Sequence, residues 1–446
     1  MNRLKQIWSH LRSSFWFMPS LIVVVSIALA IALIEADSAG SDRWLAQWPR
    51  LFGAGPDGAR GMMSTIAGSM MSVVGVTFSM ILVVLALASS QYTSRILRNF
   101  MRSRVTQVVL GIFAGIFTYC LIVLRTIRSG DGSVFVPSLA VFFGFVLALG
   151  GVGTLMFFIH HIASSIQASS IIATVARETM ASIDRLFPEK LEQRGPDEDD
   201  DDQTQCPLSE RNWRIVPARQ NGYIQSVNNA ALLRLASDRK TIVRMEHGIG
   251  EFVVQNTMLV SLALEDPPDQ ETIAAVQATF SISRHRTVDQ DAAFGIRQIV
   301  DVALKALSPG INDTTTAAMC VDYLTTILAR IAPRGIPSSY RCEDGELRVI
   351  AKGPSFESLL AESFDQIRSN AEGNVAIMSR MLDALQTLAG LTSSPHRRQS
   401  LRKQVHWIAE LAKRTIGPPH DRASIESLLA RVRGTLEAVP ALEARA

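Results

Sequence analysis

The sequence predicts an α-helical integral membrane protein with four transmembrane helices and a mixed α+β, mainly helical, cytosolic C-terminal region. Hydrophobic residues make up 48% of the 446 residues, and long apolar runs are concentrated in the first third of the chain. A helix of about 20 residues, rising about 1.5 Å per residue, crosses a bilayer core of about 30 Å. Beyond residue 210 the pattern changes to short glycine-punctuated runs and then to amphipathic helices, which indicates a soluble region.

Four apolar runs are long enough to span a membrane. The predicted spans are residues 15–34, 62–90, 105–124 and 134–159, in a membrane domain of residues 15–160 that follows a cytosolic N-terminus of residues 1–14. The first run follows Arg3, Lys5 and Arg12, as a signal peptide would, but it is longer than the usual signal segment. We therefore expect an uncleaved first helix.

The second span is rich in small residues in its middle. They are Ser64, Gly68, Ser69, Ser72, Gly75 and Ser79. Small side chains let helix backbones approach closely, so we expect this helix to be buried among other helices.

A basic bend joins the second and third spans. Residues 91–104 include Arg95, Arg98, Arg102 and Arg104 and no acidic residue. The positive-inside rule places this bend in the cytosol, and four spans then place both termini there as well. If the membrane and soluble parts are coupled, these four arginines are where we expect the contact.

Several residues of the third and fourth spans are candidates for a pore or gate. Gly111 and Gly115 form a GxxxG pattern, which predicts a close helix contact within the chain or between protomers. Polar residues near the span ends could line the mouths of a path, or they could be interfacial side chains with no such role. The candidates are Gly111, Gly115, Arg125, Arg128, His160, His161, Ser164 and Gln167.

The rest of the chain divides into five regions by composition and pattern. They are a helical extension (161–190), an acidic linker (191–210), a small β-rich module (211–265), a helical signature region (266–333), and a hairpin followed by amphipathic helices (334–446). Within the signature region, Thr287 and Gln290 form a capping-box pattern that predicts a helix start, and Asn312 or Asp313 is expected to cap the next helix.

The signature region also has the densest polar stretch of the chain. Its candidate residues are Arg284, His285, Arg286, Asp289, Asp291, Arg297, Asp301, Asn312 and Asp313. They could supply acid, base and anion-binding groups to an enzyme. The alternative is a network of ion pairs and helix caps that fixes two helices together, and the sequence favours this alternative.

Composition and motifs argue against several classes of protein. The four cysteines (Cys120, Cys206, Cys320 and Cys342) lack CxxC spacing, and no P-loop, GxSxG, HExxH or GxGxxG motif occurs. A net charge of +3 over this length does not indicate a nucleic-acid-binding protein. We therefore predict no catalytic residue, cofactor or metal site.

Two stretches of sequence resemble a known family. The segments SSQYTSRILRNFMRS (89–103) and DVALKALSPGINDTTTA (301–317), with the His160-His161 pair, are similar to the bacterial predicted-membrane-protein family called domain of unknown function 2254. The likeness extends from about Phe15 to Glu437, and Thr314 stands where the family pattern has proline. The resemblance implies an integral inner-membrane protein with a soluble C-terminal region, and it implies no activity, cofactor or catalytic residue.

Three functions remain open from the sequence. The favoured one is a homo-oligomeric channel or transport-type protein with a cytosolic sensor or vestibule. The second is a membrane-anchored regulatory or scaffold protein whose helical tail recruits a soluble protein partner. The third is a membrane-anchored enzyme that uses the polar stretch. The expected partners are the lipid bilayer and further copies of the chain, with no nucleic acid.

Overall fold

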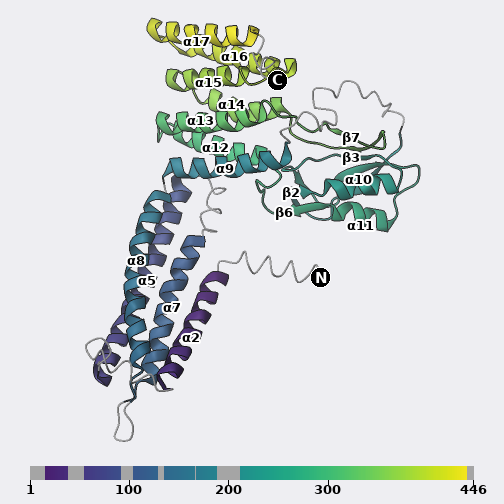
Figure 1. Cartoon of the computed structure of the whole chain (residues 1–446). Coiled ribbons are helices and arrows are strands. Elements are labelled where there is room, and N and C mark those ends of the chain that lie inside the picture. The colour runs from purple at the N-terminus through teal and green to yellow at the C-terminus, as the bar shows by residue number, and fades with distance from the viewer. Residues whose placement is uncertain are drawn as a thin grey trace, which may run out of the picture. The chain divides into compact units, whose positions relative to one another are not determined.

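A computed structural model of the chain describes residues 16–38, 55–91, 104–128, 135–165, 167–187 and 211–438 (Figure 1). The chain divides into two compact units, Met1–Gln167 and Ala168–Ala446. The predicted N-terminal segment, the acidic linker, and Arg95, Arg98 and Arg102 of the basic bend lie outside the described residues.

The first unit consists of four long apolar helices. They are α2 (Phe17–Ser38), α5 (Pro56–Gln91), α7 (Arg104–Thr126) and α8 (Ser138–Ser165). Each is long and apolar enough to cross a membrane. Helix α5 begins at Pro56, ahead of the predicted residue 62, and α8 begins after Pro137, because a proline ring is readily accommodated just before or at a helix start but not inside a helix.

Helix α7 is the centre of this unit and packs against the other three helices. The GxxxG pattern makes its contact with α2: a Cβ at Gly111 would lie 2.7 Å from Ile22 Cδ1, and one at Gly115 would lie 2.5 Å from Ser26 Oγ. The two glycines therefore hold α2 against α7 within one protomer, which is one of the two alternatives that the sequence left open.

The six small residues of α5 do not pack against the described helices of this unit. The expectation that they bury α5 among other helices is therefore not met within one protomer, and it stays a prediction for contacts between copies. All six named above are exposed, whereas Met63, Ala67 and Met70 of the same helix are buried. Methionine side chains are flexible enough to fill irregular gaps, and those of Met63 and Met70 pack over Gly144 and Gly151 of α8. Bulky side chains on α5 thus meet glycines on α8, and the small face of α5 points outward.

An aspartate at the end of α2 caps the start of α8. The Asp37 carboxylate accepts hydrogen bonds from the backbone N–H groups of Leu139 (3.1 Å) and Ala140 (3.1 Å), and it is buried. The Tyr119 hydroxyl donates to the Ala140 carbonyl at 2.7 Å. The predicted first span ends at residue 34, and this role of Asp37 was missed.

The second unit contains a stack of helices (Figure 1). The stack comprises α9 (Ala168–Leu186), α12 (Ala292–Leu307), α13 (Thr314–Ile331), α14 (Phe356–Ser369), α15 (Val375–Ala389), α16 (Pro395–Thr415) and α17 (Pro419–Glu437). Each has an apolar face buried against its neighbours, as expected of amphipathic helices. The helical extension expected over 161–190 is interrupted, since α8 ends at Ser165 and α9 begins at Ala168.

Two sheets lie in the same unit, with strand orders β1-β5-β3-β8-β7 and β4-β2-β6. The strands are β1 (Trp213–Pro217), β2 (Gly222–Val227), β3 (Val243–Met245), β4 (Phe252–Val253), β5 (Met258–Ala263), β6 (Phe280–Ser283), β7 (Tyr340–Glu343) and β8 (Glu346–Ile350). Helices α10 (Asn229–Asp238) and α11 (Gln270–Ala278) connect them. The sheets extend beyond residue 265, because β6 pairs with β2, and β8 pairs in parallel with β3.

The β7–β8 hairpin turns at Asp344 and Gly345. Both have positive φ, 54° and 79°. Two central residues with positive φ give the turn whose twist matches paired antiparallel strands. The Asp-Gly pair is therefore the local reason for a hairpin here.

Candidate functional site

The candidate pore residues do not come together within one protomer. Gly111 and Gly115 are buried against α2, whereas Arg125 and Arg128 are exposed at the end of α7 opposite Arg104. Arg128 pairs through its backbone with Phe135, with an N–H to carbonyl distance of 3.1 Å. The two glycines therefore have a packing role in this unit, and a role for them in a pore or gate stays a prediction.

The histidine pair lies near the end of α8. The His161 ring stacks on Phe157 with 5.9 Å between ring centroids, and His160 is exposed. The Ser164 hydroxyl donates to the His160 carbonyl at 2.8 Å. Gln167 lies between the end of α8 and the start of α9, within the predicted helical extension of residues 161–190.

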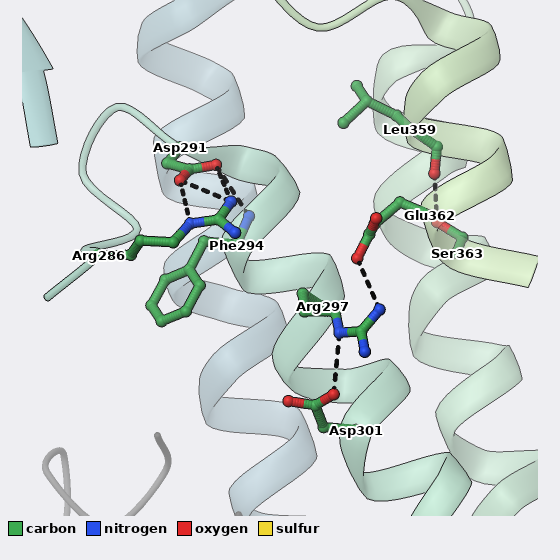
Figure 2. A network of polar contacts seen from close by, with 8 residues as sticks. All are labelled: Arg286, Asp291, Phe294, Arg297, Asp301, Leu359, Glu362 and Ser363. Carbon is green, nitrogen blue, oxygen red and sulfur yellow. Dashed lines mark hydrogen bonds and ion pairs between the residues drawn. The ribbon is translucent and has the colours of Figure 1, made fainter. Parts of the chain in front are cut away.

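The polar stretch of the signature region is built around Asp291, which caps α12 (Figure 2). Its Oδ1 accepts a hydrogen bond from the Phe294 N–H at 2.9 Å, and its Oδ2 accepts one from Arg286 Nε at 2.9 Å. The capping-box prediction at Thr287 is wrong, because Asp291 is the N-cap of α12 and the Gln290 side chain binds the backbone of β2 instead. The Gln290 Oε1 accepts a hydrogen bond from the Val227 N–H of β2 at 3.0 Å.

The pair formed by Arg286 and Asp291 is enclosed on several sides. Asp291 is 5% exposed, and burial raises the pKa of its carboxyl group against the opposing effect of Arg286. The Arg286 guanidinium lies 4.9 Å from the centroid of the Phe294 ring. Gly250, with φ of 87°, approaches both partners so closely that a Cβ there would overlap the Asp291 carboxylate. This geometry leaves no room for a substrate at the carboxylate.

A second ion pair joins α12 to α14. Arg297 Nε donates to Asp301 Oδ1 at 2.9 Å, and Arg297 Nη1 donates to Glu362 Oε1 of α14 at 3.4 Å (Figure 2). The Asp301 carboxylate therefore orients a guanidinium that reaches helix α14.

The remaining candidates of the polar stretch bind backbone or lie in solvent. Asp313 caps α13, accepting from the Thr316 N–H at 3.0 Å and the Thr316 hydroxyl at 2.6 Å, and these bonds lower the pKa of its carboxyl group. Asn312 is exposed with φ of 49°, and Arg284 and His285 are exposed. The His285 carbonyl accepts a hydrogen bond from Gln225 Nε2 at 2.6 Å.

A hydrogen bond and two ion pairs join helix α9 to the rest of the stack beside this stretch. The Ser182 hydroxyl donates to the Asp289 carbonyl at 3.0 Å. Asp184 pairs with Arg330 at 2.9 Å and with Arg334 at 2.8 Å. The polar stretch and its surroundings therefore contain ion pairs and helix caps. Among the residues that the structure describes, no group of three or more His, Cys, Asp or Glu could hold a metal ion.

Two adjacent buried arginines were missed by the sequence interpretation. Arg397 Nη1 donates to the Arg334 carbonyl at 2.7 Å, just past the end of α13. Arg398 Nη2 donates to the carbonyls of Leu436 (2.6 Å) and Ala438 (2.6 Å) at the end of α17. No sequence signal separates these two residues from the exposed basic residues around them, because their acceptors are main-chain groups far along the chain.

Comparisons with known proteins agree with a membrane location. Uncharacterized protein Mb1321c of Mycobacterium bovis and Uncharacterized protein Rv1290c of Mycobacterium tuberculosis are each 29% identical to this chain over 446 residues, covering 98% of it and 83% of the relative. No solved structure matches the chain. A family model described as "Predicted membrane protein (DUF2254)" matches residues 12–387.

Proposed function

The chain belongs to the DUF2254 family of predicted membrane proteins, and from this premise we propose that it is a homo-oligomeric channel or transport-type protein. Its membrane would be a bacterial inner membrane, with both termini and the second unit in the cytosol. One observation supports the proposal above the others, namely the outward face of α5.

This face has a repeat of seven residues. Gly61, Gly68 and Gly75 recur at one position, and Thr65, Ser72 and Ser79 recur four residues after each glycine. All six are exposed, and a Cβ at any of the three glycines would meet nothing within 4 Å. At about 100° per residue these positions lie opposite the buried face formed by Met63, Ala67 and Met70.

A repeat of this kind favours contact between helices in a membrane. Glycine and serine let two backbones approach closely, and a seven-residue period keeps the same face in contact along the helix. No helix of the same protomer occupies this face in the described residues. A second copy of the chain provides an equivalent face, so we infer that α5 is where protomers meet.

The path itself must then lie between protomers. The interior of the four-helix unit is filled by Phe113, Tyr119 and Phe158, each 0% exposed. Hydroxyl groups occur on the outward face of α5, where Thr65 donates to the Gly61 carbonyl at 2.7 Å and Ser72 to the Gly68 carbonyl at 3.1 Å. Their oxygens keep acceptor capacity, which a hydrated path at the edge of the contact between copies could use.

The test compares oligomeric state and ion flux in the same preparations. The full-length protein in mild detergent should be an oligomer by mass photometry, and proteoliposomes should release ions. Gly68→Leu and Gly75→Leu should dissociate it, because a leucine prevents close approach of two helices. Val24→Leu, at an exposed position of α2, is the matched control and should leave the oligomer intact.

Two outcomes would contradict the proposal in different ways. A monomeric wild-type protein would remove α5 as an interface. A stable oligomer that gives neither currents in planar bilayers nor flux from liposomes would remove the channel and favour the regulatory or scaffold alternative.

A further inference from the structure

A groove of about 550 Å³ lies between α7 and α8 on the side of the membrane unit where α7 begins. Helix α7 contributes Val105, Val108 and Ile112 to its wall. Helix α8 contributes Gly150 and Phe157, together with Gly153. The Thr154 hydroxyl, which also lines the groove, donates to the Gly150 carbonyl at 2.8 Å. The wall is therefore apolar along its length.

Glycines keep this groove open. A Cβ at Gly150 or Gly153 would meet nothing within 4 Å. Gly151, on another face of α8, is different, because a Cβ there would lie 3.2 Å from Ile116 Cδ1 of α7. Helix α8 thus touches α7 through Gly151 and leaves a hollow beside it at Gly150 and Gly153.

One end of the groove is positively charged. Arg104 lines it, is exposed, and is the first residue of α7. The first turn of α7 has no acidic residue, and the N–H groups of a first helical turn have no partner within the helix. The start of a helix also has the positive end of the helix dipole. The Arg104 side chain, the free N–H groups and the helix dipole would each stabilise an anionic group bound at this end.

We propose that the groove binds an anionic phospholipid, with one acyl chain along Val105, Ile112 and Gly153 and the phosphate at Arg104. The wall has apolar side chains along its length and a single guanidinium at one end, which matches the division of a phospholipid into tail and headgroup. A helix of another protein would meet the open glycines with a bulkier surface and would need an acid placed at Arg104. The inference does not depend on channel activity.

Native mass spectrometry of the full-length protein, purified in mild detergent, tests the headgroup and the groove separately. Phosphatidylglycerol should be retained in preference to phosphatidylcholine with the same acyl chains. Arg104→Gln should reduce that preference about fivefold, the effect of one basic side chain near an anionic surface. Gly153→Leu should reduce retention of both lipids, because the leucine side chain fills the groove.

Two variants serve as matched controls. Arg125→Gln removes an exposed arginine at the opposite end of α7, and Val152→Leu adds bulk at an exposed position of α8 that does not line the groove. Both should retain phosphatidylglycerol as the wild type does. Equal loss in a control and in its paired variant would overturn the proposal, as would unchanged retention in Arg104→Gln and Gly153→Leu.

A second measurement needs no variant. A phosphatidylglycerol with a photoactivatable diazirine in its acyl chain, reacted with the wild-type protein, should label peptides that contain residues 105–112 and 150–157. Labelling restricted to other helices would overturn the proposal even if a variant failed to fold.

Discussion

Thr179 of α9 lies directly against Gly295 of α12, so closely that a Cβ on Gly295 would overlap the Thr179 hydroxyl. Both residues are buried, and the hydroxyl donates to the Val175 carbonyl of its own helix at 2.7 Å. The two helices therefore cross at a point where only glycine fits. Because α9 is the first helix of the second unit, this crossing joins the start of that unit to the rest of its helical stack.

Gly295→Ala should lower the free energy of unfolding by about 1–3 kcal/mol, as overpacking of a close-packed interior does. The thermal midpoint of the purified protein measures the change. Thr179→Ala in the same chain should restore part of the loss, because it removes the hydroxyl. Gly310→Ala is the control, since a Cβ at Gly310 meets nothing within 4 Å. Equal effects of the two glycine variants would contradict the crossing.

Arg286→Ala should destabilise the protein by about 3 kcal/mol, because it leaves the buried Asp291 carboxylate without its cation. Burial already holds the pKa of Asp291 above its ordinary value, so the folded state binds the proton more tightly than the unfolded state. In this variant the free energy of unfolding should therefore rise as the pH falls through the raised pKa. Chemical denaturation at several pH values measures it. Arg284→Ala, at an exposed neighbour, should show no such trend.

Asp313→Ala should cost about 1 kcal/mol, the usual value of a helix N-cap. Hydrogen bonds from Thr316 hold the pKa of Asp313 below its ordinary value. The stabilisation is therefore complete above about pH 4, the unfolded pKa, and is lost as the pH falls through the lower folded pKa. Asp313→Asn keeps a capping oxygen without the charge, so the stability difference between it and the wild type should shrink on acidification. A stability difference between Asp313→Asn and the wild type that stayed constant from pH 7 to pH 2 would contradict a contribution of the Asp313 charge to the cap.

Asp37→Ala should destabilise the membrane unit by about 1 kcal/mol or more, because the first N–H groups of α8 lose their acceptor. Asp37→Asn should retain most of the stability through its remaining oxygen. Thermal unfolding in detergent compares them with Glu35→Ala, which changes an exposed side chain on the same helix. A Glu35→Ala effect as large as that of Asp37→Ala would show that the cap is unimportant.

The sequence predicted local features better than contacts between distant residues. Hydropathy located the four apolar helices. Local chemistry reduced the cap of α13 to Asn312 or Asp313, of which the structure uses Asp313, and it predicted a hairpin after residue 334, which turns at Asp344 and Gly345. The sequence could not show which face of α5 packs inside the protomer, because a membrane helix is apolar all round and hydropathy has no direction. It also missed the cap formed by Asp37, whose acceptor and donors are about a hundred residues apart.

In the candidate site, too, the sequence indicated local features but not the contacts between distant residues. Residue types indicated a cluster of polar side chains between Arg284 and Asp313, but they did not show which acid caps α12. Thr287 and Asp291 both suit an N-cap, and the choice depends on Arg286, on the loop at Gly250, and on the use of Gln290 by β2. These partners come from separate elements, so a pattern within the stretch cannot supply them.

The Arg398 guanidinium is surrounded by main-chain carbonyls at the end of α17, which take the place of water around a buried cation. The carbonyl of Ala438 is one of them. A shortened chain that ended before Thr435 would lack the α17 carbonyls that accept hydrogen bonds from Arg398. The buried guanidinium would lose these partners, which destabilises the folded state. For recombinant expression, the usable C-terminal limit therefore lies after Ala438, and an affinity tag should be attached beyond that residue.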